Sequence, residues 1–344
     1  MNSSKVLSKE KKELNQMKSK DLFKKLRSDY FLKLLFNNLE KKKLLEIIKY
    51  NNNLKKRINI NINNYKEYHE LIEIEIKPVN NKYGKFINFS DKEEKYYHIY
   101  FNNNKEEIKR NYINKGEQIK IIKIIIDNPI DSFKDLFYKC SIIESIYFKK
   151  FYRNNIKNMY NMFHNCSSLK ELNLNHFNTN NVTDMGFMFS CCSLLKELNL
   201  NHFNTKNVTN MWDMFAWCSS LKKLNVNNFN TNKVTDMRSM FYYCSSLKEL
   251  NLNNFNTNNV TDIGLMFHGC SSLKELNLNN FNTNNVTDMS YVFYGCSSLK
   301  ELNLNNFNTN NETDMICMFS GCLDELKLKI KSQFKNFKEE AFDD

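Results

Sequence analysis

The sequence contains little glycine and proline, seven and two residues among 344, and no motif that marks a catalytic site. A Gly-rich phosphate loop, a metalloprotease helix motif and a nucleophile elbow are all missing. No run of about 20 apolar residues occurs, although a membrane-spanning helix would need one. These absences argue against an enzyme and against a membrane span, and we expect neither a cofactor nor a metal.

The start of the chain also lacks a targeting signal. The first 20 residues are polar, with no apolar stretch ahead of a cleavage site, and the first cysteine is Cys140. We therefore expect a cytoplasmic protein, with the cell surface as the alternative. The net charge of +12 is concentrated in residues 1–60, which hold 17 Lys and Arg against 6 Asp and Glu. A solvated basic region accounts for this imbalance, so no nucleic-acid partner is expected.

What the sequence does have is a core and a repeat. Apolar residues make up 41% of the chain, which excludes a wholly disordered protein. A phrase beginning CSSLKELNLNHFNTNNVTDM is written six times at a fixed interval of 26 residues, opened in turn by Cys166, Cys192, Cys218, Cys244, Cys270 and Cys296. A fixed period in the twenties with an L-x-x-L-x-L frame is typical of a solenoid of stacked rungs.

One rung shows how the phrase is expected to fold. Leu172 and Leu174 alternate with polar residues, as a half-buried strand requires. An apolar series at i, i+3, i+4 and i+7 then predicts one face of a short helix, formed by Met185, Met188, Phe189 and Cys192. Thr183 would cap that helix. Stacked rungs would merge their apolar side chains into ladders about 4.8 Å apart.

The repeat phrase carries a family resemblance. The segments FNTNNVTDMSYVFYGCSSLKELNLNNFNT and NVTDMRSMFYYCSSLKELNL resemble repeats of the BspA-like leucine-rich-repeat surface proteins of bacteria and protists. The resemblance covers about residues 166–322. It implies an α/β fold, a right-handed leucine-rich-repeat-like solenoid with a parallel strand and a short helix in each rung. It also implies a role in binding or adhesion, and it transfers no functional residue.

The segments outside the regular copies complete the domain organisation. We expect a disordered charged lead over 1–20, a helical segment over 21–65 and a β-rich cap over 66–139. The solenoid would span 140–322, with one degenerate and six regular rungs, and 323–344 would form a C-terminal cap with an amphipathic helix. The run YFLKLLFNNLEKKKLLEIIKYNNNLKKRI is weakly similar to F-box segments, which bind a ubiquitin-ligase adaptor, although their usual proline is missing.

The cysteines and histidines offer little chemistry. Cysteines at the repeat period would form a straight row, which cannot surround zinc tetrahedrally, so we interpret them as buried free thiols. Side chains that point in parallel would also strain a disulfide between rungs. His176 and His202 share one place in adjacent rungs, but later rungs hold asparagine there, so a metal pair is not expected.

Two surfaces remain as candidate binding sites, and the protein partner is unknown. On the strand face, two polar columns are predicted: Glu171, Glu197, Lys223, Glu249, Glu275 and Glu301, and Asn173, Asn199, Asn225, Asn251, Asn277 and Asn303. A solvated face kept polar for solubility is an equally good interpretation. On the helical side, large residues stand where other rungs differ: Trp212, Trp217, Arg238, Tyr242, Tyr243 and Tyr291. These residue types dominate interface energies.

Three functions stay open from the sequence. The first is a non-enzymatic repeat protein that mediates protein–protein interaction, and the second is an F-box-like ubiquitin-ligase substrate adaptor. The third is a surface adhesin, for which four N-x-T sequons begin at Asn181, Asn207, Asn259 and Asn285. A turn that leads into a capped helix explains the same residues without sugar. The oligomeric state is not determined by the sequence.

Overall fold

The structure is a computed structural model that describes Lys56 and residues 71–127, 130–151, 153, 155–308, 313–334 and 336–343. The chain divides into two units, Met1–Glu70 and Leu71–Asp344. The lead predicted for 1–20 and the helical, F-box-like segment predicted for 21–65 lie outside the described residues, apart from Lys56. All that follows concerns the second unit.

A five-stranded sheet opens this unit, in the order β3-β5-β1-β6-β7. Its strands are β1 (Ile72–Pro78), β3 (Tyr97–Phe101), β5 (Ile122–Ile126), β6 (Ile143–Phe151) and β7 (Glu171–Asn173). The pairs β1–β5, β1–β6 and β3–β5 are antiparallel, whereas β6–β7 is parallel. A separate antiparallel pair joins β2 (Gly84–Lys85) to β4 (Tyr112–Ile113), and η1 (Glu94–Tyr96) precedes β3. The antiparallel sheet therefore gives way to parallel pairing at β6.

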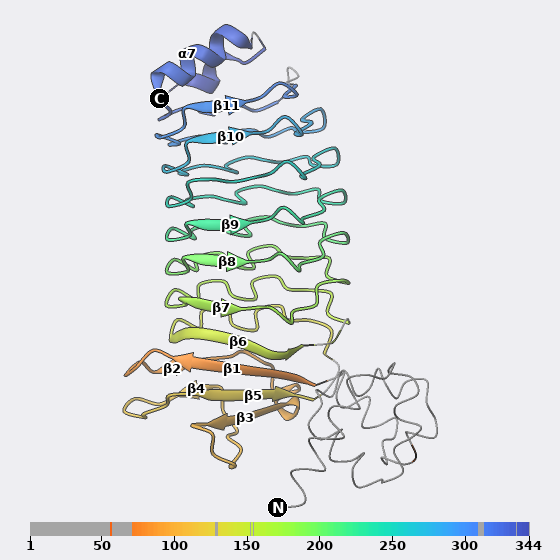
Figure 1. The fold of residues 1–344 in the computed structure, drawn as a ribbon, viewed down its shortest axis with the longest axis vertical. Coiled ribbons are helices and arrows are strands. Elements are labelled where there is room, and N and C mark those ends of the chain that lie inside the picture. Colours follow the sequence, from red (N-terminus) through yellow and green to blue (C-terminus); the bar gives the residue numbers. More distant parts are fainter. Residues whose placement is uncertain are drawn as a thin grey trace, which may run out of the picture. The chain divides into compact units, whose positions relative to one another are not determined.

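Beyond β6 the chain passes through one 26-residue rung after another, stacked in parallel register (Figure 1). The strands labelled in these rungs are β8 (Glu197–Asn199), β9 (Lys223–Asn225), β10 (Glu275–Asn277) and β11 (Glu301–Asn303). On the opposite side, single parallel bridges run from Ser132↔Asn158 to Asp288↔Asp314, each joining residues 26 apart. Both sides of the stack therefore follow the sequence period.

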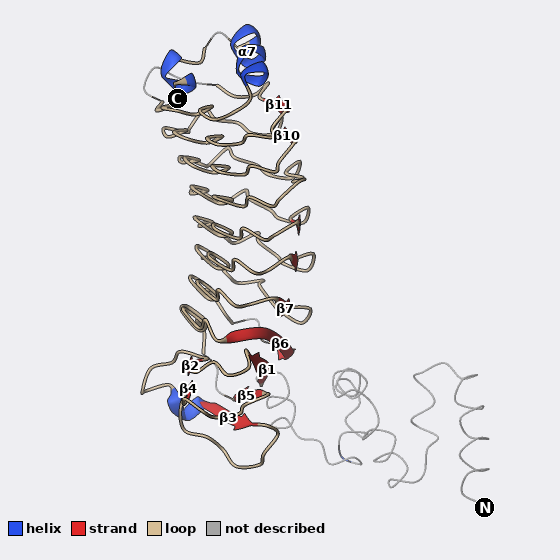
Figure 2. Cartoon of the chain, turned by 90° about the vertical axis from the view of Figure 1, so that its left-hand side faces the viewer, coloured by secondary structure: helices blue, strands red, loops and turns tan. Residues whose placement is uncertain are grey.

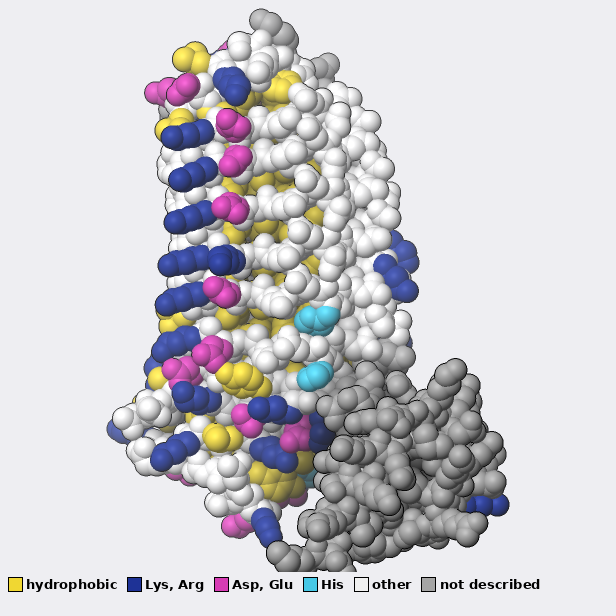
Figure 3. Space-filling view, in the orientation of Figure 1, with side chains coloured by type: hydrophobic (Ala, Val, Ile, Leu, Met, Phe, Trp, Pro, Cys, Tyr) yellow, Lys and Arg dark blue, Asp and Glu magenta, His cyan; other side chains and the backbone are white. Residues whose placement is uncertain are grey.

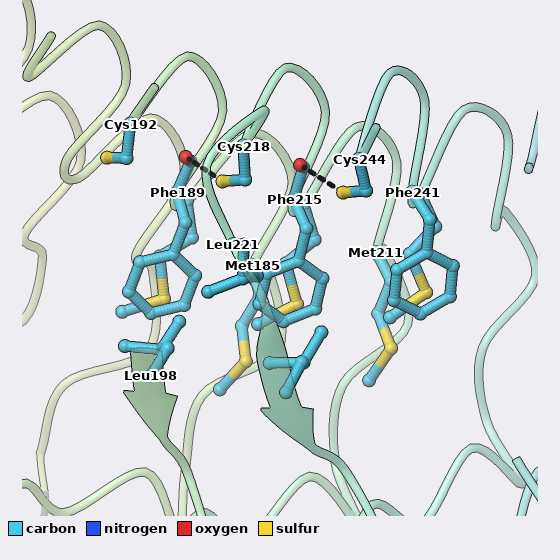
Figure 4. Close-up of a cluster of buried hydrophobic side chains, with 14 of the residues drawn as sticks. Met185, Phe189, Cys192, Leu198, Met211, Phe215, Cys218, Leu221, Phe241 and Cys244 are labelled. Carbon is cyan, nitrogen blue, oxygen red and sulfur yellow. Dashed lines mark hydrogen bonds between the residues drawn. The ribbon is translucent and has the colours of Figure 1, made fainter. Parts of the chain in front are cut away.

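The interior holds ladders of identical side chains. Met188, Met214 and Met240 are fully buried, as the repeat predicts for core positions. Phe rings stack from rung to rung, with centroids 5.6 Å apart for Phe189–Phe215 and planes 6° from parallel. Figure 4 shows the rings, methionines and thiols of neighbouring rungs repeating side by side. Each rung therefore buries its apolar side chains against those of its neighbours.

The segment expected to be a helix in each rung forms turns instead, which corrects the sequence interpretation (Figure 2). In the turn segment that begins at Met185, alternate backbone N–H groups donate to the next rung, for example Met185 to the Asn210 carbonyl at 3.1 Å and Phe189 to the Met214 carbonyl at 3.0 Å. The intervening N–H groups close tight turns within the rung, such as Met188 to Met185 at 3.2 Å. An α-helix would keep all these bonds inside one rung.

The distance between rungs explains why this segment forms turns and not a helix. An α-helix is about 10 Å wide, whereas rungs joined by backbone hydrogen bonds lie about 4.8 Å apart. The turns fit because two residues of each rung adopt positive φ, for example Phe187 at 56° and Cys191 at 60°. Thr183 does not cap a helix, and its hydroxyl donates to the Lys157 carbonyl at 3.2 Å. The i, i+3, i+4, i+7 pattern therefore marks buried positions without a helix.

The C-terminal end closes the stack with a helix and a turn. Between residues 71 and 343, the only α-helix that the structure describes is α7 (Asp324–Gln333), which begins two residues after Cys322 and lies within the segment 323–344 expected to form the cap. A helix satisfies its own backbone groups and so needs no further rung to pair with. The 3-10 turn η2 (Glu339–Phe342) supplies carbonyls to the last rung, since Phe319 N–H donates to Ala341 O at 2.7 Å. Phe342 also stacks on Phe319 at 5.1 Å.

Candidate protein-binding surfaces

The acidic column predicted on the strand face is exposed. The glutamates of β7, β8, β10 and β11 lie in the solvent, and Lys223 takes their place on β9. The residue before each of them is an exposed lysine: Lys170, Lys196, Lys222, Lys248, Lys274 and Lys300. Figure 3 shows the resulting basic column beside the acidic column along the stack. The parallel register produces both columns, because it repeats each side chain directly above its copy.

The asparagines of the second column face the solvent and also stabilise the turn that follows each strand. In all six rungs the asparagine Oδ1 accepts the backbone N–H two residues later, for example Asn225 from Asn227 at 3.0 Å. Such a bond stabilises the turn that ends the strand. The amide nitrogens of this column are donors, so the column can offer hydrogen-bond donors to a partner.

A groove lies along the strand face between these columns. It consists of two hollows that share Glu249, Leu250 and Asn251, one of about 510 Å³ and one of about 730 Å³. The first hollow reaches back to Glu197, and the second ends against Phe334. We call the two hollows together the strand-face groove. The structure thus brings the predicted Glu, Lys and Asn side chains from 197 to 303 together around one depression.

The six large residues predicted on the helical side lie on the turn side of the stack. In other rungs the same places hold residues as different as Gly, Ser, Ala, Cys, Asp, Leu, Ile and Phe, so variation between rungs is concentrated there. Trp217 stacks on Tyr243 with centroids 4.2 Å apart and planes 4° from parallel. The Arg238 guanidinium lies 4.2 Å from the centre of the Trp212 ring, a cation–π distance. Trp217 also contacts Tyr242, with ring centroids 5.5 Å apart, so these large side chains lie side by side on the turn side.

Two further residues join this surface, and the sequence interpretation missed both. His268 lies 4.8 Å from Tyr242 and stacks on Tyr294 at 4.6 Å. It also approaches Tyr291 at 6.4 Å, which links that residue to the others. We call the following residues the turn-side ridge: Trp212, Trp217, Arg238, Tyr242, Tyr243, His268, Tyr291 and Tyr294. Its most exposed members are Trp217 at 45% and Tyr294 at 37%. Comparing the rungs column by column would have found them.

A carboxyl group next to the ridge, that of Asp213, has a strongly shifted pKa. Burial raises the pKa of Asp213 to about 7, the nearby Arg238 guanidinium opposes that rise, and Asp236 adds to it. Arg238 itself extends to the Asp262 carboxylate at 3.6 Å. Asp213 therefore changes its charge near neutral pH at a place beside the aromatic side chains.

The cysteines are free thiols with a defined backbone partner. No disulfide joins any of the ten, and eight are buried. Each ladder thiol from Cys166 onward donates to the carbonyl of a Phe in the preceding rung, for example Cys218 to Phe189 O at 3.2 Å (Figure 4). Burial raises the pKa of Cys218 to about 12, so its thiolate is disfavoured.

Among the described residues, no group of three or more His, Cys, Asp or Glu is arranged to hold a metal ion. No helix in the described part of the chain is long and apolar enough to cross a membrane. These two findings concern only the residues that the structure describes.

Comparison with known proteins identifies the repeat. A search of curated proteins finds no match to the chain, and a search of solved structures finds none either. One family matches twice, over residues 131–225 and 217–332, which together exceed half of the 344 residues and exclude the F-box-like segment. This match is consistent with the BspA-like repeat resemblance. The chain therefore belongs to the family described as "Mycoplasma protein of unknown function, DUF285".

Proposed function

We propose that this protein is a non-enzymatic, leucine-rich-repeat-like solenoid that binds other proteins. The stacked rungs act as a rigid scaffold, because a parallel bridge joins each rung to the next on the turn side, and the strand pairs β6–β7, β8–β9 and β10–β11 add to these bridges on the strand side. The resemblance to BspA-like surface proteins points in the same direction, since those proteins are associated with binding and adhesion. We assign the contact to the turn-side ridge.

The observation that carries this proposal is the concentration of Trp, Tyr and Arg at the places where otherwise near-identical rungs differ. Core places repeat because the stacking requires it, but the ridge places tolerate glycine, as Gly269 shows where Tyr243 stands one rung earlier. The rungs with glycine at this place keep the same left-handed backbone conformation, so stacking does not require a large side chain there. Aromatic residues and arginine in one partly exposed cluster are the composition of interface hot spots.

The test is an affinity purification of the full chain from its native cell. The variant carries Trp217→Gly and Tyr243→Gly, because later rungs hold glycine at the same place with the same backbone conformation. The control is Lys206→Asn, an exposed residue away from the ridge that becomes the residue of its neighbours. We expect the captured protein to be lost with the double variant, at least about tenfold, and retained with the control. Equal capture by the wild type, the double variant and the control would refute the assignment of the binding site to the ridge.

Adhesion at the cell surface is the second candidate. The sequon asparagines Asn181, Asn259 and Asn285 are exposed, so sugar transfer is sterically open to them. Against this, Asn259 Nδ2 and Asn285 Nδ2 donate to carbonyls of the preceding rung at 2.7 Å each, which gives the sequon a structural role. Intact mass of the native protein decides between the two: added sugar supports the adhesin, and an unmodified mass supports a local structural role.

A further inference from the structure

The outer edge of the N-terminal sheet is covered by one short segment of the chain. Among the described strands, β3 is the last in the sheet order and pairs with β5 along one edge. Along its other edge the segment 102–110 folds back, and the Ile108 N–H donates to the Ile99 carbonyl at 2.8 Å. We call the segment 102–110 the strap. Because an uncovered strand edge is a template for pairing with another chain, the strap controls access to this edge.

Beyond its first turn, the strap has two hydrogen-bonded attachments to β3 among the described residues. One is the backbone bond between Ile108 and Ile99. The other joins the Glu107 carboxylate to the His98 ring, with Glu107 Oε1 3.0 Å from His98 Nδ1. Residues 102–106 of the strap are exposed. A change in the His98 contact therefore bears directly on how firmly the strap is held.

His98 faces a carboxylate from each of its two ring nitrogens. Its Nε2 lies 3.0 Å from Oδ2 of Asp127, which follows directly after β5. An ionised carboxylate only accepts hydrogen bonds, so both ring nitrogens must carry a proton to satisfy both contacts. The closed strap therefore requires the imidazolium form. In agreement with this, the hydrogen bond to Asp127 raises the pKa of His98, burial opposes the rise, and Glu107 adds to it.

Loss of one proton from His98 acts on the strap. A neutral imidazole keeps a single N–H, and its other nitrogen then presents a lone pair to a carboxylate. Glu107 has a second cation, because Lys109 Nζ donates to the same Oε1, whereas the Asp127 carboxylate has no other polar partner among the described residues. The remaining proton therefore stays with Asp127, and the contact to Glu107 is lost. Further titratable groups around this cluster come from the strap, η1 and β3: Lys109, Glu94 and Tyr100.

We propose that the strap is a pH-sensitive cover of the β3 edge, closed when His98 is protonated and released when His98 is neutral. Since the pKa of His98 is raised in the folded protein, the contact is complete below about pH 6.5 and is lost as the pH rises through the raised value. Release exposes the Ile99 carbonyl and the outer edge of β3, where a further strand could pair. The strap and the turn-side ridge are separate surfaces, so each can be tested without the other.

The test is hydrogen exchange of the full chain, followed by NMR at about pH 5.5 and about pH 8. The protection factor of the Ile108 amide reports the strap, because it corrects the exchange rate for the rate of an unstructured chain at the same pH. The reference is the Val79 amide, which donates to the Ile142 carbonyl at 2.8 Å outside the strap. We expect the ratio of Ile108 to Val79 protection to fall at least about threefold at the higher pH. An unchanged ratio would overturn the proposal.

Three variants separate the His98 contact from general effects of pH. Glu107→Gln removes the carboxylate that faces Nδ1, so the ratio should be the same at both pH values. Glu106→Gln makes the same change on the adjacent exposed residue and should keep the wild-type fall. Asp127→Asn should move the fall to a lower pH, because His98 loses its largest interaction in favour of the charged form. A wild-type response in Glu107→Gln, no response in Glu106→Gln, or an unshifted fall in Asp127→Asn would contradict the proposal.

Discussion

A buried threonine in each rung links that rung to the next, and its removal should destabilise the stack. Thr231 is 1% exposed. Its Oγ1 accepts the Asn256 N–H at 2.7 Å and donates to the Asn256 carbonyl at 2.8 Å. Thr231→Val keeps the shape of the side chain but removes both bonds. The backbone N–H and C=O of Asn256 would then lose their partner in a part-buried place.

The expected cost follows from those two groups. An unsatisfied buried polar group costs about 1–3 kcal/mol, so we expect Thr231→Val to lower the free energy of unfolding by about 2–4 kcal/mol. Urea unfolding followed by circular dichroism would show an earlier midpoint, and hydrogen exchange would show faster exchange around residue 256. The matched control is Thr235→Val, because Thr235 is exposed and its hydroxyl makes only a 3.4 Å bond.

The control should change the free energy of unfolding by less than about 0.5 kcal/mol. Equal costs for the two variants, or a cost below about 0.5 kcal/mol for Thr231→Val, would show that the threonine ladder does not hold the rungs together.

Three further predictions concern the thiols, the turns and pH. Only the two half-buried thiols, Cys191 and Cys317, should react with iodoacetamide in the folded protein, and the eight buried ones should react on unfolding, as read by mass spectrometry. Gly269→Ala should lower the free energy of unfolding by about 1–3 kcal/mol, because φ is +70° and the added Cβ would lie 3.1 Å from a tyrosine ring. Gly116→Ala, with φ of +89° and open space around it, should cost about 1 kcal/mol in the same urea experiment. Since burial raises the pKa of Asp213 to about 7, its contribution to stability is present below about pH 4 and is lost as the pH rises through 7. Asp213→Asn should therefore stabilise the protein at about pH 8, by about 1–2 kcal/mol after allowance for partial exposure, and leave stability at about pH 4 unchanged.

Much of the candidate site could be read from the repeat. A 26-residue period places each residue above its copy, so the Glu and Asn columns and the group around Trp217 were predictable as columns. His268 and Tyr294 occupy the same rung place as Tyr242, so alignment of the rungs indicates them as well. The groove could not be predicted, since its two hollows depend on how far the strand surface is depressed between columns. The engagement of Asn225 Oδ1 in a turn likewise depends on local backbone geometry.

The burial of individual residues could also be predicted where it follows from apolar side chains at regular spacing. Met188 and Phe189 are fully buried, as their spacing indicates. The same spacing suggested a helix, because i, i+3, i+4, i+7 is the usual sign of one. Tight turns with a positive-φ residue, such as Phe187, bury the same places. Periodicity reports which side chains face the core, and it does not report which backbone conformation brings them there.

The sequence by itself determined the period, the identity of the ladders and the residues that cover the core, because these follow from side-chain polarity and repetition. Tertiary structure alone decided that the turn side pairs from rung to rung at the same close spacing as the strand side. That spacing leaves no room for a helix in each rung, and it forces the backbone into turns that expose the ridge. It also decided that the helix of the C-terminal cap, α7, begins at Asp324, because a helix satisfies its own backbone groups without a further rung.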